Sequence, residues 1–173
     1  GTSVNDFTGP VVYTVTAEDG STRSYTVTVG VQIGGHWTEH AVPGAMGGSN
    51  WTSVAVSADG TRLAATVNSG SIWTSADGGA TWTECTSQGT NYWTDVASSA
   101  DGMRLAVTVG GYIRTSVDGG QTWTQRAAAG SRSWECITSS ADGTRLAAAV
   151  YHGYIYTSSD GGESWTRRGS LTE

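Results

Sequence analysis

The stretch S-A-D-G-G-A-T-W at residues 75–82 occurs three times in this chain of 173 residues, with small changes. The second copy is S-V-D-G-G-Q-T-W at 116–123, and the third is S-S-D-G-G-E-S-W at 158–165. The copies therefore lie 41 and then 42 residues apart. A fixed period of this length indicates stacked supersecondary units. We align the chain on three repeats that begin at Trp51, Trp93 and Trp134.

Short apolar runs alternate with glycine turns inside each repeat. In the first repeat the runs cover residues 52–56, 62–67, 72–75 and 81–85, and the turns lie at 58–60, 69–70 and 77–79. Four short runs joined by tight turns predict a four-stranded antiparallel meander. No amphipathic 3.6-residue pattern longer than a turn is present, so we expect almost no helix.

The D-G-G turn has a clear structural use. Its glycines supply positive φ angles, and the Ser and Asp side chains can bond to the amides of the turn. The Trp at the start of the next strand can fold over the turn as an apolar cap. We expect these residues to be scaffolding rather than catalytic or metal-binding: Ser75, Asp77, Gly79, Trp82, Ser116, Asp118, Gly120, Trp123, Ser158, Asp160, Gly162 and Trp165.

The pattern S-x-D-x-G-x-[TS]-W resembles the Asp-box, or bacterial neuraminidase (BNR) repeat, and all three copies match it. The resemblance covers Trp51 to about Arg168. It implies an all-β fold of three β-propeller blades, with the motif between the third and fourth strands of each blade. Asp-box propellers include sialidases, xyloglucan-type glycosidases, sorting-receptor ectodomains and photosystem assembly factors. The resemblance therefore implies the fold more firmly than the function.

The first fifty residues depart from the repeat. Residues 11–29 alternate between apolar and polar side chains around a turn at 18–21, which predicts a β-hairpin. This stretch resembles the terminal hairpin of bacterial immunoglobulin-like repeats of secreted and surface proteins. Residues 34–40 match the fourth strand of a blade. We therefore predict a hairpin segment at 1–33 and, at 34–173, three blades with a leading outer strand.

Three meanders and one extra strand do not close a propeller, which typically has four to eight blades. Residues 1–40 could form an irregular fourth blade, a longer parent chain or another subunit could complete the ring, or exposed edges could pair between copies as a filament. A β-trefoil also fits the strand count but ranks lower. The start at Gly1, without a signal peptide, predicts a processed product or a piece of a longer chain.

Composition excludes several classes of function. The net charge is −6, and all nine basic residues are scattered arginines, so nucleic acid is not an expected partner. No apolar run approaches the length of a membrane span. Cys85 and Cys136 lie at different positions of their repeats and lack C-x-x-C spacing, which leaves their pairing open. His36, His40 and His152 show no metal-binding spacing, and we expect no metal and no cofactor.

Catalytic patterns are also missing. The F/Y-R-I-P segment of sialidases is absent, and Asp95 and Glu135 are the one acidic pair worth considering for a glycosidase. Arg62, Arg104 and Arg145 recur in phase, either as an anion-binding ring or, as we favour, as arginines paired with neighbouring turns. We therefore predict that the chain is not an enzyme.

Aromatic residues favour binding instead. The candidate ligand-binding residues are Trp51, Trp93, Trp134, Asp95 and Glu135. The three tryptophans could stack on sugar rings, although the favoured alternative is that they pack between sheets. Asn50 begins a formal glycosylation sequon, N-W-T, which suits a secreted protein.

These observations predict a non-catalytic module of an extracellular or cell-surface protein, which binds a glycan or protein ligand or serves assembly. One alternative is a structural subunit of an extracellular filament built by edge-strand pairing, which the lysine-free, Ser/Thr/Gly-rich composition would suit. Another is a fragment of a sialidase-like or xyloglucanase-like glycoside hydrolase whose catalytic residues lie on other blades.

Overall fold

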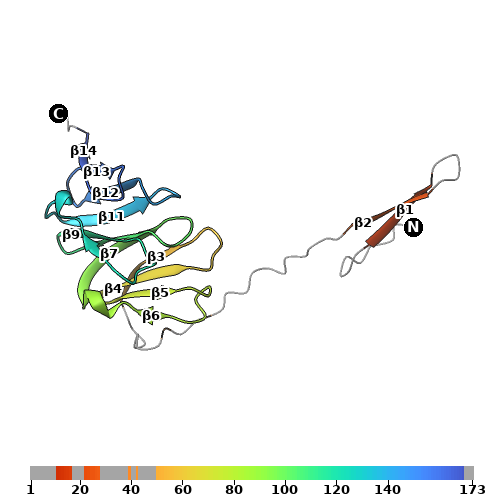
Figure 1. Ribbon diagram of the computed structural model, residues 1–173, viewed down its shortest axis with the longest axis horizontal. Helices are drawn as coiled ribbons and strands as arrows, with labels where there is room; N and C mark the ends of the chain where they lie inside the picture. Colours follow the sequence, from red (N-terminus) through yellow and green to blue (C-terminus); the bar gives the residue numbers. More distant parts are fainter. Residues whose placement is uncertain (1–10, 17–21, 28–38, 40–41, 43–49, 170–173) are drawn as a thin grey trace. The chain divides into compact units, whose positions relative to one another are not determined.

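The computed structural model describes residues 11–16, 22–27, 39, 42 and 50–169 (Figure 1). Its described residues form fourteen β-strands and two three-residue 3-10 segments, η1 (Thr86–Gln88) and η2 (Ala127–Ala129). The prediction of an all-β chain with almost no helix is therefore confirmed. The chain divides into two compact units, residues 1–39 and 40–173. The predicted boundary between residues 33 and 34 lies outside the described residues and stays a prediction.

The first unit contains one described hairpin. Strand β1 (Val11–Thr16) pairs antiparallel with β2 (Thr22–Val27), from Val11 opposite Val27 to Thr16 opposite Thr22. The hairpin expected from the alternating pattern is confirmed over these residues. The predicted turn at 18–21 and most of the predicted outer strand at 34–40 lie outside the described residues. Among the described strands, β1 and β2 pair only with each other.

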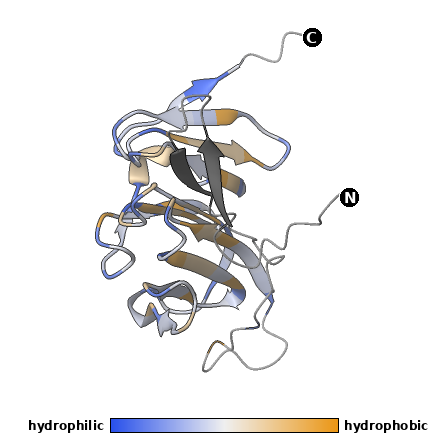
Figure 2. Cartoon of the chain, turned by 90° about the vertical axis from the view of Figure 1, so that its right-hand side faces the viewer, coloured by the Kyte–Doolittle hydropathy of each residue, from blue (hydrophilic) through white to orange (hydrophobic). Residues whose placement is uncertain are grey.

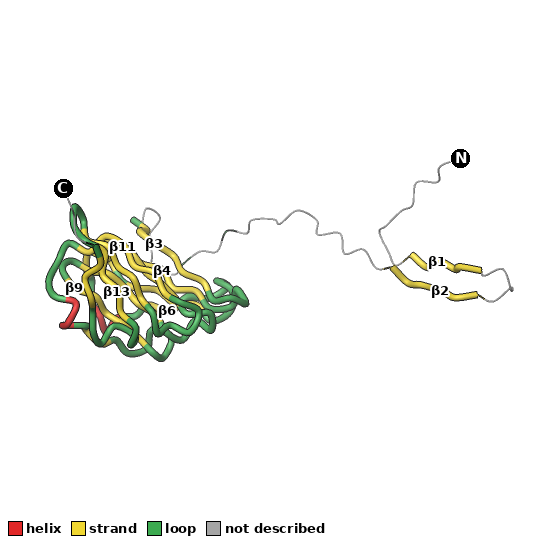
Figure 3. The backbone as a smooth tube through the Cα atoms, turned by 90° about the horizontal axis from the view of Figure 1, so that it is seen from above, coloured by secondary structure: helices red, strands yellow, loops and turns green. Residues whose placement is uncertain are grey.

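The second unit contains three successive four-stranded meanders, which we call blades A, B and C (Figures 1 and 3). Blades A and B also pair at one edge, where Asn68 lies opposite Tyr92, so they form one eight-stranded sheet, and blade C forms a separate four-stranded sheet. Blade A contains β3 (Trp51–Val56), β4 (Leu63–Gly70), β5 (Ile72–Ser75) and β6 (Thr83–Glu84). Blade B contains β7 (Asn91–Ser98), β8 (Leu105–Val109), β9 (Tyr112–Ser116) and β10 (Thr124–Gln125). Blade C contains β11 (Trp134–Ser139), β12 (Leu146–Val150), β13 (Ile155–Ser158) and β14 (Thr166–Arg168). The β-propeller class is confirmed, and the β-trefoil alternative is wrong.

The predicted strands of blade A agree with the structure at the first and third strands and differ at the second and fourth. Strand β4 continues to Gly70, through the turn predicted at 69–70, because Asn68 and Gly70 pair with Tyr92 and Asn91 of β7.

Strand β6 covers only Thr83–Glu84, whereas the sequence predicts a strand over 81–85. The difference arises because Thr81 belongs to the turn, where its amide donates a hydrogen bond to Asp77 over 2.8 Å. Beyond the strand, the amide of Cys85 still donates to the carbonyl of Ile72 over 2.8 Å.

Each first strand contains a bulge immediately after its opening tryptophan. The register shifts between Trp51 and Ser53, between Trp93 and Asp95, and between Trp134 and Cys136. In a regular strand, residues three apart point to opposite faces. The extra residue of the bulge reverses that relation, so Trp93 and Val96 lie in the same core cluster.

Apolar side chains fill the two junctions between blades. One cluster joins Ala64 and Ile72 of blade A to Trp93, Val96 and Val107 of blade B. The second cluster joins Ala106 and Ile113 of blade B to Trp134, Ile137 and Ala148 of blade C. Figure 2 shows these apolar stretches on the strands. We call the side of a blade that faces its predecessor the front face, and the side that faces its successor the back face.

We predict that Trp93→Ala lowers the free energy of unfolding by about 3–5 kcal/mol, because Trp93 is fully buried between blades A and B. Urea denaturation followed by intrinsic fluorescence measures this change. The matched control is Tyr92→Ala, the adjacent aromatic residue, which is 68% exposed and should cost less than about 0.5 kcal/mol. Equal effects of the two substitutions would contradict the packing of the first junction.

Candidate functional site: the aromatic end of the blades

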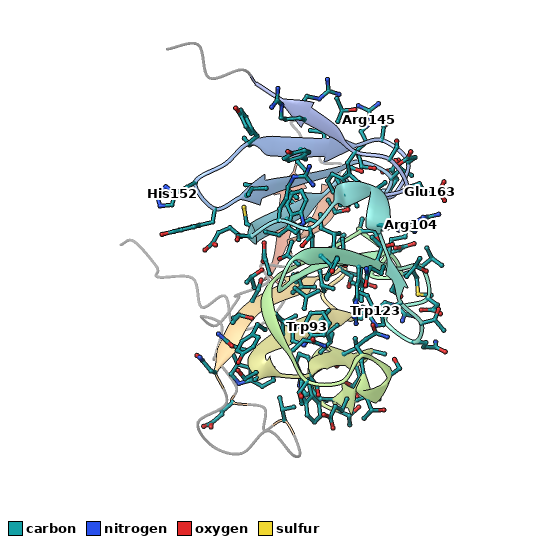
Figure 4. The ribbon with its side chains drawn as sticks, turned by 90° about the vertical axis from the view of Figure 1, so that its left-hand side faces the viewer. Trp93, Arg104, Trp123, Arg145, His152 and Glu163 are labelled. Carbon is teal, nitrogen blue, oxygen red and sulfur yellow. The ribbon has the colours of Figure 1, made fainter. Side chains whose placement is uncertain are left out.

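Antiparallel meanders give the blade stack two chemically different ends. The first hairpin turn (S-A-D-G) and the third (S-x-D-G-G) of every blade lie at one end, which we call the aspartate end. The starts of the first strands and the second hairpin turns lie at the other, which we call the aromatic end. In Figure 4, His152 lies at the aromatic end, and Arg104, Arg145 and Glu163 lie at the aspartate end.

The S-x-D-G-G turns satisfy their own hydrogen-bonding groups. Ser75 donates its hydroxyl to Asp77 over 2.8 Å and accepts the amide of Gly79 over 2.9 Å. Asp77 accepts the amide and the hydroxyl of Thr81 over 2.8 and 2.6 Å. The same bonds recur at Ser116, Asp118, Gly120 and Thr122, and at Ser158, Asp160, Gly162 and Ser164. The turn aspartates are therefore fully engaged within their own turns.

The tryptophans of these turns differ in whether the indole N–H has a hydrogen-bond partner. Trp123 and Trp165 donate their indole N–H to the carbonyls of Gly120 and Gly162 over 2.9 and 3.0 Å, and each packs against a junction cluster. The indole nitrogen of Trp82 is buried and has no hydrogen-bond partner among the described residues. Trp82 belongs to blade A, whose front face meets no other described blade.

The in-phase arginines lie against the turns of the next blade. A Cβ atom added to Gly102 of blade B would lie 2.5 Å from Cβ of Arg62, and one added to Gly143 of blade C would lie 2.6 Å from Cβ of Arg104. Only glycine therefore permits this approach. Arg62 and Arg104 contact neighbouring turns, as the favoured interpretation of the sequence had it, although the turn belongs to the following blade. Arg145 holds the same position on blade C.

Hydrogen bonds lower the pKa of the turn aspartates. At Asp77 the largest cause is the side-chain hydrogen bond from Thr81, followed by the backbone bond from Thr81, and the pKa falls from 3.8 to about 2. The corresponding bonds from Thr122 lower the pKa of Asp118 to about 2. These carboxylates are ionised at neutral pH and already bonded, which does not suit a general acid.

Asp95 connects all three blades. One carboxylate oxygen accepts the Ser53 hydroxyl of blade A over 2.5 Å and the amide of Val96 over 2.8 Å. The other oxygen accepts the amide of Ile137 of blade C over 2.7 Å. The sequence singled out Asp95 as a candidate ligand residue and missed this contact set, because its partners lie 42 residues away on either side. Glu135, its predicted companion, is exposed on β11.

The three in-phase tryptophans lie in different surroundings. Trp93 and Trp134 are buried in the two junctions, where the packing alternative placed them, and the indole of Trp93 donates to the carbonyl of Gly70 over 2.9 Å. Trp51 is 42% exposed, because no described blade lies against the front face of blade A. A ligand-binding role for Trp51, Trp93, Trp134, Asp95 and Glu135 stays a prediction.

Exposed tyrosines mark the aromatic end. The sequence pattern had pointed to Tyr112 as one of the third-strand aromatic residues that could stack on sugar rings, but it missed Tyr92 and Tyr151. Tyr92, Tyr112 and Tyr151 are 68%, 40% and 61% exposed. Tyr92 and Tyr112 lie near the starts of β7 and β9, and Tyr151 lies in the β12–β13 turn. The signal that could have identified them is that Tyr92 and Tyr151 replace smaller residues at the matching positions of the other repeats.

The β12–β13 turn holds an unusual backbone conformation. His152 has a φ of 49°, in the left-handed region that side chains rarely occupy. Its ring meets that of Tyr151 edge to face, with centroids 4.2 Å apart. The guanidinium of Arg167 lies 4.4 Å from the ring centroid of Tyr154, just after this turn. The turn therefore presents aromatic and basic groups together at the aromatic end.

The described residues contain no group of three or more His, Cys, Asp or Glu side chains suited to a metal ion. Both cysteines are free thiols: Cys136 is exposed, and Cys85 is buried, which raises its pKa. Over the described part of the chain, no helix has the length and apolar character needed to cross a membrane.

Comparison with protein families gives one match. Residues 1–29 match the family described as "SGBP, N-terminal". This match covers the first unit only, and it does not extend to the blades. No curated protein matches the chain.

Solved structures resemble the blades in fold. YCF48 bound to D1 peptide has a TM-score of 0.59 and 18% identity, over 69% of this chain and 40% of that chain. The GH74 enzyme of Niastella koreensis has a TM-score of 0.58 and 20% identity, over 92% of this chain and 24% of that chain. A chain of the nidogen/laminin complex has a TM-score of 0.57 and 18% identity, over 69% and 47%. The chain thus spans less than half the length of each, and these similarities show the β-propeller fold.

We predict that the turn aspartates make the free energy of unfolding decrease at acidic pH. Their folded-state pKa lies below the unfolded value of 3.8, so the folded state binds fewer protons. This contribution is fully present above about pH 4 and is lost as the pH falls towards 2. At pH 7, Asp118→Asn should lower the melting temperature by roughly 3–6 °C and make the loss below pH 4 shallower.

The control for this measurement is Glu163→Gln, an exposed acid inside the third copy of the turn. It should leave both the melting temperature and the acid profile nearly unchanged, because the hydrogen bonds of this turn in the described structure come from Ser158, Ser164 and the backbone, and none from the Glu163 side chain. Thermal unfolding by circular dichroism at several pH values measures both variants. An unaltered acid profile for Asp118→Asn would contradict the assignment.

Proposed function

We propose that this chain is part of a non-catalytic cell-surface protein whose Asp-box propeller blades bind a glycan at the aromatic end. The observation that carries the proposal is the set of exposed tyrosines at that end, Tyr92, Tyr112 and Tyr151. Tyrosine rings offer flat apolar faces that stack on sugar rings, and their hydroxyls bond to sugar hydroxyls. At the aspartate end the turn aspartates are already bonded within their own turns.

The match of the first unit supports the cell-surface and glycan parts of the proposal. Residues 1–29 match the N-terminal family of SGBP, a surface glycan-binding protein. The blades would then belong to a chain whose N-terminal part is of a cell-surface family. The N-W-T sequon at Asn50 and the absence of lysine agree with this location.

The acidic residues of the blades support a non-catalytic role. A glycosidase needs two free carboxyl groups roughly 5–9.5 Å apart. Both oxygens of Asp95 accept hydrogen bonds that hold blades A, B and C together, so this residue is already committed to structure. Glu135 is exposed and would lack its partner. The glycoside-hydrolase alternative keeps some support from the GH74 neighbours, of which this chain matches about a quarter.

Isothermal titration calorimetry tests the proposal, with soluble xyloglucan titrated into the purified chain. We expect binding, and we expect Tyr92→Ala and Tyr151→Ala each to weaken it by about 3–10-fold, because each removes one stacking face. Mixed-linkage β-glucan serves as a second probe of the same class. The matched control is Val117→Ala, an apolar residue that is 57% exposed at the aspartate end and should leave binding unchanged.

Two results would overturn the proposal. Failure of both polysaccharides to bind would remove the glycan ligand and favour a protein ligand at the same end. Release of new reducing ends from xyloglucan during overnight incubation would contradict the non-catalytic role and favour the hydrolase alternative. Glu135→Ala would then identify whether that carboxyl group takes part.

A further inference from the structure

Two arginines of blade C lie against tyrosine rings near the aromatic end. The guanidinium of Arg132 lies 4.5 Å from the ring centroid of Tyr156, and its Nε donates to the hydroxyl of that tyrosine over 2.9 Å. The guanidinium of Arg167 lies 4.4 Å from the ring centroid of Tyr154. Each arginine is therefore held on the ring of one tyrosine. We call these four residues the arginine–tyrosine cluster.

The strand register gathers the cluster on one face of blade C. Tyr154 and Tyr156 are two positions apart, so both side chains point to the same side of the sheet. Arg167 lies opposite Tyr156 on β14, and its guanidinium reaches past that residue to the ring of Tyr154. Tyr156 packs against the apolar cluster between blades B and C, which contains Trp134. The arginine–tyrosine cluster thus lies at the rim of a junction between two described blades.

The other two blades do not repeat this cluster. In blade A the residues equivalent to the second tyrosine–arginine pair are Ser71 and Glu84, and the serine hydroxyl donates to the carboxylate over 2.6 Å. In blade B they are Tyr112 and Gln125, so the tyrosine is present but its partner is uncharged. The cluster is therefore not explained by packing that every blade needs.

Both arginines keep hydrogen-bond donors for a ligand. Within the described residues, Arg167 makes no hydrogen bond, and its contact is with the ring of Tyr154. Arg132 donates to the hydroxyl of Tyr156 and to the carbonyl of Ala129, both of which are neutral. A guanidinium has five N–H donors and no acceptor. The unused donors of two cations suit an anionic group best.

The described acidic side chains of blade C lie away from these arginines. Asp142, Asp160 and Glu163 belong to turns of the aspartate end, where Figure 4 shows Glu163. Glu135 is on β11, two strands from β13, a separation of about 10 Å. The chain as a whole has a net charge of −6 and repels anions in general. A preference for an anionic ligand would therefore come from local groups.

We propose that Arg132 and Arg167 bind an anionic substituent of the glycan, either the carboxylate of a uronic acid or a sulfate ester. This inference rests on the proposed glycan function and names the class of glycan, an acidic one. Carboxylate and sulfate oxygens accept pairs of hydrogen bonds from the guanidinium fork. The tyrosine rings fix the direction of each fork and leave its outer donors free. The exposed ring of Tyr151, at the same end of blade C, offers a stacking face for a sugar.

Calorimetric titration of the purified chain with three forms of one polymer tests the proposal. The forms are neutral xyloglucan, xyloglucan whose galactose residues are oxidised at C6 to uronic acids, and xyloglucan sulfated to the same charge density. Because the sugar backbone is the same in all three, differences in affinity measure the charged group. We expect at least one charged form to bind on the order of 10-fold more tightly than the neutral form, and the tighter one identifies the substituent.

Arg167→Gln should remove most of this difference and change the affinity for neutral xyloglucan by less than about 2-fold. Arg132→Gln should act in the same direction, but it also removes support from Tyr156, so thermal unfolding must accompany it. The matched control is Arg145→Gln, which makes the same change of charge at an exposed arginine of the aspartate end. It should retain the full difference between charged and neutral forms.

The outcomes separate this inference from the proposed function. Binding of neutral xyloglucan, with equal or weaker binding of both charged forms, would overturn the inference and leave the proposed function standing. Failure of all three forms to bind would overturn both. Tighter binding of a charged form that persists in Arg167→Gln but is lost in Arg145→Gln would overturn the assignment to blade C and place the anion at the aspartate end.

Discussion

Burial of blade faces by neighbouring blades is the interaction on which the second unit depends. A four-stranded sheet has two faces, and in this chain both carry apolar side chains that one sheet cannot bury alone. The bulge after each opening tryptophan aligns Trp93 with Val96, and Trp134 with Ile137, on the front faces of their blades. The back faces contribute small or β-branched residues, so each junction interdigitates large side chains with small ones.

The repeated turns contribute to the same packing. Because Ser and Asp satisfy the amides within each turn, the turns need no help from outside and can be compact. Their glycines then allow the turn of one blade to lie directly on the arginine of the blade before it. The arginine of S-A-D-G-x-R and the glycine of the next repeat are thus two halves of one contact, which explains why both recur in phase.

Local patterns predicted most of the fold, and contacts between repeats were the part they missed. The strands of blade A, the turns and the hairpin at 11–27 follow from alternation and turn residues that are adjacent in the sequence. The three-blade role of Asp95 and the Arg104–Gly143 contact join residues about forty positions apart, for which a single sequence offers no signal. The bulges lie inside each blade, and the alternation of the first strands did not predict them. Trp51, Trp93 and Trp134 appear equivalent in sequence, yet only the order of the blades decides which are buried.

Aromatic residues that recur in every repeat can be distinguished from those that occur in one repeat only. A residue present in every blade at the same place is explained by packing that every blade needs, as for Trp123 and Trp165. Tyr92 and Tyr151 have no such explanation, because the other repeats place smaller residues there and both rings are exposed. The ring of Tyr151 packs edge to face on that of His152. The positions of Tyr92 and Tyr151, which the repeat does not require, are therefore where the proposed ligand of the aromatic end is best tested.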